Sequence, residues 1–160
     1  MLLPDDLILS DKPTLATMTD IFNCYGSSVI AVKEVSEEAV PTLGIVDHNP
    51  IDSKVSSINA MVEKPRLADA PSNLAIIGRY VLTPQVFDAL ADLGPGALGE
   101  IQLTDAIARL LPSQGAYAYR FSGEHFDVGT PQGLLKASVY AALHRDEISD
   151  DLRSWISLVL

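Results

Sequence analysis

The sequence predicts an α/β fold with a mixed, mainly parallel sheet flanked by helices. Two observations lead to this prediction. Segments with helical and strand-like patterns alternate along the 160 residues, as they do when helices and strands build one layered domain. Several of the strand-like runs are continuously apolar, which is typical of strands covered on both faces. A chain of this length can enclose a hydrophobic core of its own.

Five segments show apolar residues at steps of three and four, the spacing that places them on one face of a helix. Proline and threonine mark several starts, because proline suits a first helical turn and threonine caps it. Glycine or proline marks several ends. The predicted helices begin near Pro13, Thr83–Pro84, Leu103, Thr130–Pro131 and Ser149, and the first three end at Gly26, Gly94 and Pro112.

Apolar runs between these helices predict strands. The opening residues Met1–Leu3 look like the end of one more strand, with Asp5 and Asp6 in the loop after it. Strands usually span roughly five or six residues, so we expect the chain to begin inside an element and to be a fragment, incomplete at its amino-terminal side. The other predicted strands are Ser28–Val32, Gly44–Val46, Ile58–Glu63, Leu74–Leu82 and Ala116–Arg120.

Charge and composition exclude several classes of function. The formal net charge of −10 repels both the nucleic-acid backbone and anionic membranes. No apolar run approaches the roughly 20 residues of a membrane-spanning helix, and the amino terminus lacks a signal-peptide pattern. The lone cysteine, Cys24, leaves no internal disulfide, so a cytoplasmic location is expected. Small phosphorylated substrates remain compatible with the charge, because a bound divalent cation can invert the field at one site.

Charged residues follow the predicted strands at positions where α/β proteins bind ligands. Asp5 and Asp6 follow the first strand, Glu63 and Lys64 end another, and Asp127 follows a short apolar segment. Ligands of open α/β sheets bind outside the carboxyl ends of the strands, so we expect these residues to line one crevice. Two carboxylates there would suit Mg²⁺ together with substrate phosphates, and a lysine would offset phosphate charge.

Each of these signals also has a plain structural interpretation. An Asp-Asp pair after a strand is most often a turn or a helix cap, and an adjacent Glu63–Lys64 pair is usually a surface feature. Asp127 can be a turn former. The histidines lack metal-ligand spacing and are interpreted as surface or hydrogen-bonded side chains: His48, His125 and His144. The pattern of residues alone therefore predicts an α/β domain and does not predict a specific function.

Five ordered sequence blocks resemble the bacterial UTP–glucose-1-phosphate uridylyltransferases over nearly the whole chain. The longest is Ala70-Pro71-Ser72-Asn73-Leu74-Ala75-Ile76-Ile77-Gly78-Arg79-Tyr80-Val81-Leu82, and the block before it is Val62-Glu63-Lys64-Pro65. The others are Leu3-Pro4-Asp5-Asp6, Gly99-Glu100-Ile101-Gln102-Leu103-Thr104-Asp105-Ala106-Ile107 and Phe126-Asp127-Val128-Gly129-Thr130. The resemblance implies a nucleotide-diphospho-sugar transferase-like fold, Mg²⁺ as cofactor, and UTP or UDP-glucose and glucose 1-phosphate as partners, in a homo-oligomer.

The resemblance also implies a role for each matching residue. Asp5 and Asp127 match the two magnesium-binding aspartates. Lys64 matches a lysine that contacts the sugar-side phosphate, and it is the candidate catalytic residue. The implied sugar-binding positions are Asp6, Glu63, Gly44 through its backbone, and Ile76 through its backbone.

The family's glycine-rich loop, which grips the nucleotide triphosphate, has no counterpart in this sequence. We therefore expect residues 1–160 to be the single sugar-phosphate- and metal-binding portion of a nucleotidyltransferase domain, without its nucleotide-binding half. Such a portion is expected to be inactive on its own. Two alternatives stay open: a non-catalytic sugar-phosphate-binding or oligomerisation remnant, and a nucleotidyltransferase for another nucleotide–sugar pair.

Overall fold

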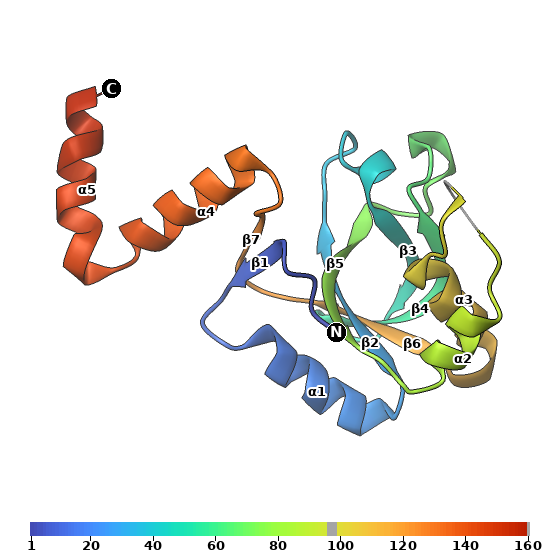
Figure 1. Cartoon of the computed structure of the whole chain (residues 1–160). Coiled ribbons are helices and arrows are strands. Elements are labelled where there is room, and N and C mark those ends of the chain that lie inside the picture. The colour runs from blue at the N-terminus through green and yellow to red at the C-terminus, as the bar shows by residue number, and fades with distance from the viewer. Residues whose placement is uncertain (96–98, 160) are drawn as a thin grey trace. The chain divides into compact units, whose positions relative to one another are not determined.

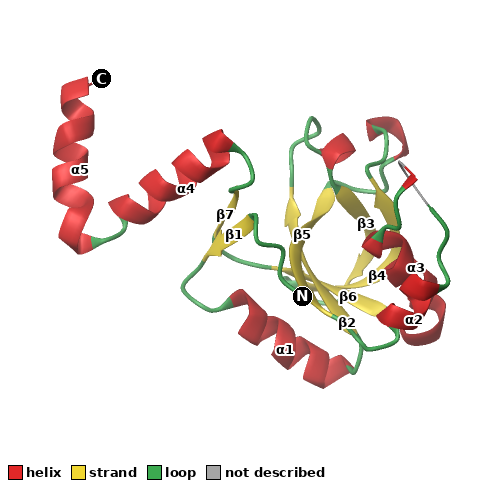
Figure 2. Ribbon diagram, in the orientation of Figure 1, coloured by secondary structure: helices red, strands yellow, loops and turns green. Residues whose placement is uncertain are grey.

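The computed structural model describes residues 1–95 and 99–159, and the chain divides into two compact units. The first unit comprises Met1–Leu2 and Ser10–Ser122. The second comprises Leu3–Leu9 together with the described residues from Gly123 onward. Figure 1 traces the elements in chain order, and Figure 2 distinguishes helices from strands. Each unit has its own sheet.

A closed five-stranded barrel forms the centre of the first unit. Its strands follow one another around the ring in the order β2, β5, β3, β4 and β6. Among the strands that the structure describes, only β2 and β6 pair in parallel, and all other neighbours are antiparallel. The barrel strands are β2 (Ser28–Glu34), β3 (Gly44–Pro50), β4 (Val55–Glu63), β5 (Leu74–Val81) and β6 (Ala116–Arg120).

The α/β class and the mixed sheet are confirmed, but the prediction of a mainly parallel sheet is wrong. A short turn joins β3 to β4, where the N–H groups of Ile51 and Asp52 donate to the Val55 carbonyl at 2.9 and 3.1 Å. Such a turn joins antiparallel neighbours, whereas a parallel pair needs a longer crossover. In a closed barrel, one face of each strand points into the interior, and helices cover parts of the other face. Strands covered on both faces have continuous apolar runs, so these runs arise here without parallel pairing.

Two helices pack on strands of the barrel, and a third packs on one of these helices. Helix α1 (Thr14–Tyr25) packs on β2 and β5, α3 (Leu103–Gln114) packs on β4, and α2 (Val86–Ala91) packs on α3. Helix α1 ends as predicted at Gly26, whose N–H donates to the Phe22 carbonyl at 2.7 Å. Two short 3-10 helices, η1 (Val40–Thr42) and η2 (Leu67–Asp69), lie in the loops before β3 and β5.

Helix α3 continues through Pro112, although proline was predicted to end it. A proline inside a helix removes one backbone donor and strains the preceding turn. Here it lies in the last turn, and the helix stops at Gly115, whose N–H donates to the Leu111 carbonyl at 3.0 Å. The loss of one hydrogen bond near a helix end is therefore tolerated, and the glycine determines the boundary.

The hydrophobic core of the first unit comes mainly from the predicted strands. Strands β2 and β5 are buried over almost their whole length, in agreement with their continuous apolar sequence. The largest fully buried side chains are Met18, Val29, Ile30, Val32, Val40, Ile45, Val46, Leu74, Ile77 and Ile107. These residues make the barrel a rigid support for side chains at the strand ends.

The second unit consists of a two-stranded antiparallel sheet and two helices. Strand β1 (Asp6–Leu9) pairs with β7 (Glu124–Asp127), and Asp6 lies opposite Asp127 in the register. The loop expected to hold both Asp5 and Asp6 is thus shorter than predicted, since Asp6 begins a strand. Helices α4 (Pro131–Leu143) and α5 (Asp146–Val159) follow. Within the described ranges, none of the helices combines the length and apolar character needed to cross a membrane.

Candidate substrate and metal sites

The second unit brings Asp5 and Asp127 together, although they lie 122 positions apart in the sequence. The Val128 N–H donates to the Asp5 carbonyl at 2.7 Å, which extends the pairing of β1 and β7 by one more bond. A Cβ atom placed on Gly129 would lie 3.1 Å from Asp127 Oδ1 and 3.4 Å from Asp5 Oδ2. Both carboxylates therefore reach the same small volume beside Gly129.

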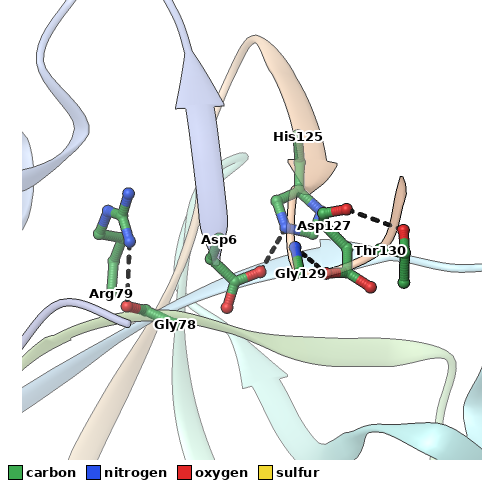
Figure 3. A network of polar contacts seen from close by, with 7 residues as sticks. All are labelled: Asp6, Gly78, Arg79, His125, Asp127, Gly129 and Thr130. Carbon is green, nitrogen blue, oxygen red and sulfur yellow. Dashed lines mark hydrogen bonds and ion pairs between the residues drawn. The ribbon is translucent and has the colours of Figure 1, made fainter. Parts of the chain in front are cut away.

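The turn between β7 and α4 holds Asp127 in place from both its side chain and its backbone (Figure 3). The Gly129 N–H donates to Asp127 Oδ1 at 3.0 Å, and the Thr130 hydroxyl donates to the Asp127 carbonyl at 3.2 Å. Thr130 also caps α4, because its Oγ1 accepts from the Gly133 N–H at 3.1 Å. The predicted Thr130–Pro131 helix start is confirmed, and it serves to fix the aspartate as well as the helix.

Gly133 leaves the space in which the backbone of Asp127 lies. A Cβ atom at position 133 would stand 1.7 Å from the Asp127 carbonyl oxygen and 2.8 Å from Thr130 Oγ1. Helix propensity alone predicts that Gly133→Ala stabilises α4 by about 1 kcal/mol. We expect the opposite sign, with the free energy of unfolding falling by about 2 kcal/mol in urea denaturation, because the clash is with backbone. Ser138→Ala, at an exposed position of α4, is the control and should change it by less than about 0.5 kcal/mol.

Asp6 faces His125, to which the sequence analysis assigned no functional role. His125 Nε2 lies 2.5 Å from Asp6 Oδ1, and the two side chains are only 17% and 19% exposed. Figure 3 shows this pair beside Asp127 at the β1–β7 ladder. The interpretation of His125 as a hydrogen-bonded histidine is confirmed. Its position two residues before Asp127 on a strand is the signal that could have placed it on the same face.

The acidic pair offers two carboxylates, the type of ligand that Mg²⁺ uses. Across residues 1–95 and 99–159, no group of three or more His, Cys, Asp or Glu side chains gathers in a way that could hold an ion by itself. Two aspartate carboxylates suit Mg²⁺, which typically takes one or two carboxylates and completes its octahedron with water and substrate phosphate. Asp5 and Asp127 therefore fit the ion that the sequence implied.

In the first unit, three strands bring together Gly44, Glu63 and Ile76. Gly44 begins β3 and lies opposite Glu63, the last residue of β4, in the register. A Cβ atom on Gly44 would stand 2.9 Å from Ile76 Cδ1 and 3.1 Å from Glu63 Oε2. The absence of a side chain at Gly44 therefore lets the glutamate and the isoleucine lie against its backbone.

Lys64 follows Glu63 with an unusual backbone conformation. Its φ angle is 46°, the one positive value for a non-glycine residue in the described part of the chain. Its N–H donates to the Leu43 carbonyl at 3.1 Å, which holds this turn against the start of β3. A left-handed conformation costs a non-glycine residue roughly 1–2 kcal/mol, and such outliers cluster at functional sites.

Thr104 joins this group from helix α3, and sequence reasoning had given it no role. Its hydroxyl donates to Glu63 Oε2 at 2.6 Å, and its side chain is buried, with 7% of the residue exposed. The signal that could have found it was its place in the block Gly99–Ile107. Periodicity only places Thr104 in the first turn of a helix, and it does not say what the helix packs against.

The predicted site residues thus fall into two sets, each formed within its own unit. Asp5, Asp6 and Asp127 belong to the second unit. Gly44, Glu63, Lys64 and Ile76 belong to the first. The expectation that both sets line one crevice stays a prediction.

Comparison with known proteins places the sequence among nucleotide-transferring enzymes. Residues 1–143 match the family model described as nucleotidyl transferase. The chain is 45% identical, over 98% of its length, to UTP–glucose-1-phosphate uridylyltransferase 2 of Staphylococcus saprophyticus, and 44% identical to the Staphylococcus epidermidis uridylyltransferase over the same share. It covers 54% of each relative, so it spans about half the length of the curated relatives it matches.

Solved structures agree with this similarity. A UDP-glucose pyrophosphorylase in complex with UDP-glucose superposes with a TM-score of 0.85 at 40% identity, over 90% of this chain and 56% of that one. The UTP-bound enzyme of Acinetobacter baumannii also gives 0.85, at 34% identity, over 97% of this chain and 54% of that one.

Proposed function

The chain belongs to the nucleotidyl transferase family, and on this basis we propose that it supplies the sugar-binding and metal-binding side of an enzyme that forms UDP-glucose. The proposed reaction converts UTP and glucose 1-phosphate into UDP-glucose and pyrophosphate. The observation that carries the proposal is the grouping of the Asp5–Asp127 pair and of Gly44, Glu63 and Ile76 in a chain so similar to uridylyltransferases.

Asp5 and Asp127 would hold Mg²⁺. Their oxygens lie within 3.4 Å of one point beside Gly129, which supports this assignment. When bound, the ion would offset the negative charge of the substrate phosphates. The chain's own contribution is to hold two like-charged carboxylates side by side, through the Val128–Asp5 backbone bond and the Gly129 N–H.

In the first unit, Glu63, Gly44 and Ile76 would bind the glucosyl group. For Asp6, in the second unit, the sugar-binding role rests on the sequence resemblance alone. The Glu63 carboxylate accepts hydrogen bonds, and the close packing around Gly44 leaves backbone rather than side chain to meet the sugar. A carboxylate that accepts from sugar hydroxyls gives specificity, because a sugar without a matching hydroxyl leaves a buried polar group unpaired.

Lys64 would contact the phosphate of the sugar substrate. In the proposed step, a phosphate oxygen of glucose 1-phosphate bonds to the α-phosphorus of UTP, and the bond from that phosphorus to the β-phosphate oxygen breaks. Pyrophosphate leaves with the electron pair. The attacking oxygen is already anionic, so no general base is needed, and positioning and charge neutralisation carry the catalysis. Lys64 would supply one of the positive charges.

A homo-oligomer is part of the proposal. Large apolar side chains on α5 are exposed, including Trp155 at 58% and Leu158 at 84%. Exposed apolar surface of this kind is typical of protein–protein contacts.

A chimaeric protein tests the proposed function. The 160-residue chain would be joined to the part of the Staphylococcus epidermidis relative that it does not span. We expect the chimaera to form UDP-glucose from UTP and glucose 1-phosphate, and the chain alone to form none, since nothing in its sequence resembles the triphosphate-gripping loop. The proposal would be contradicted if the isolated chain formed UDP-glucose as fast as the chimaera, or if the chimaera folded but formed none.

A further inference from the structure

Thr104 connects helix α3 to the acidic end of strand β4. The 2.6 Å distance from its hydroxyl to Glu63 Oε2 is typical of a hydroxyl donating to a charged carboxylate. The two residues are 41 positions apart in the sequence, so the contact is tertiary. Thr104 is 7% exposed, whereas Glu63 is half-buried. The threonine thus contacts the carboxylate from the buried side of the glutamate.

This hydrogen bond fixes the orientation of the Glu63 carboxylate. A threonine hydroxyl has one proton to donate, and that proton is used on Oε2. The bonded atoms lie against the start of β3, since a Cβ on Gly44 would be 3.1 Å from Oε2 and 3.5 Å from Thr104 Oγ1. Among the described residues, Thr104 is the hydrogen-bond partner of this carboxylate. Oε1 keeps its full acceptor capacity for a ligand.

We propose that Thr104 is a positioning residue, which holds the Glu63 carboxylate in the orientation that accepts hydrogen bonds from the sugar. The inference rests on the proposed function, because it takes Glu63 as a sugar-binding residue. A glutamate has several rotatable bonds, and ordering them on binding reduces affinity. With Thr104 in place, the carboxylate is ordered before the sugar arrives.

A fixed carboxylate also serves specificity. An oriented acceptor matches the hydroxyls of one sugar and leaves a polar group unpaired with an epimer, whereas a mobile carboxylate adapts to both. Removal of the Thr104 hydroxyl should therefore reduce the preference for glucose 1-phosphate over galactose 1-phosphate, in addition to weakening binding.

Two substitutions at this position separate the hydroxyl from the shape of the side chain. Thr104→Val keeps the branched shape and removes the donor, and Thr104→Ser keeps the donor. Binding of each sugar phosphate to the whole 160-residue chain would be measured by calorimetry with Mg²⁺ present. We expect Thr104→Val to bind glucose 1-phosphate about tenfold more weakly and to discriminate less. Thr104→Ser should keep both properties of the unmodified chain.

Thr83→Val is a closely matched control. Thr83 is equally buried at 7%, and its hydroxyl donates to Gln114 Oε1 at the same 2.6 Å. Neither Thr83 nor Gln114 belongs to the proposed sugar site. This variant should therefore lose stability much as Thr104→Val does, while its affinity for glucose 1-phosphate stays unchanged.

Three results would overturn the inference. Unchanged affinity and discrimination in Thr104→Val would mean that Glu63 needs no support. Equal weakening in Thr104→Ser or Thr83→Val would show a general structural effect instead. If the unmodified chain binds no glucose 1-phosphate, the proposed function fails and the inference fails with it. This outcome differs from the first one, in which the unmodified chain does bind glucose 1-phosphate.

Discussion

Asp127→Ala is expected to weaken Mg²⁺ binding to this chain about a hundredfold or more. Loss of residues that merely support metal ligands already reduces affinity roughly 10- to 100-fold, and Asp127 is proposed as a ligand itself. Its partner Asp5 would be left as the single carboxylate beside Gly129. High Mg²⁺ concentrations should partly restore occupancy, because the remaining carboxylate still attracts the ion.

The Gly129 amide provides a direct reporter for this experiment, because its N–H donates to Asp127 Oδ1. Its NMR resonance should shift during Mg²⁺ titration of the unmodified chain. Asp150→Ala, which removes an exposed aspartate of α5, is the matched control for lost negative charge. Lys64→Ala should leave Mg²⁺ affinity unchanged, since the lysine is assigned to phosphate. Equal Mg²⁺ affinity in Asp127→Ala and the unmodified chain would reject the metal assignment.

Glu63→Gln is expected to weaken glucose 1-phosphate binding roughly 10- to 100-fold, since hydrogen bonds to a charged group contribute about 1.5–3 kcal/mol. The substitution keeps the size of the side chain and removes the charge that accepts from Thr104. Calorimetry with glucose 1-phosphate would measure the change. Glu37→Gln, at an exposed position, is the control for net charge. If both variants bind like the unmodified chain, the sugar site lies elsewhere.

Local patterns predicted the elements better than their arrangement. Strand β6 matches its predicted range Ala116–Arg120, and α1 ends at the predicted Gly26. The prediction ended β3 at Val46 because the residues after Val46 are polar. The strand runs on to Pro50 because these residues pair with β4 in a hairpin. Barrel closure depends on which strands meet, and apolar runs carry no information about that choice.

In the candidate sites, too, the sequence predicted individual residues better than their contacts. Asp5, Glu63 and Asp127 were identified because they occur in ordered motifs. The bonds from Thr104 to Glu63 and from His125 to Asp6 connect residues 41 and 119 positions apart. Single-sequence periodicity describes neighbours within a few residues, so it could not predict these contacts.

Titration of glucose 1-phosphate into the unmodified 160-residue chain, with and without Mg²⁺, tests the central claim most directly. The account predicts saturable binding that tightens when Mg²⁺ is added, because a bound cation offsets the negative charge of the phosphate. A chain that is folded by circular dichroism yet shows no saturable binding at any Mg²⁺ concentration would contradict the account.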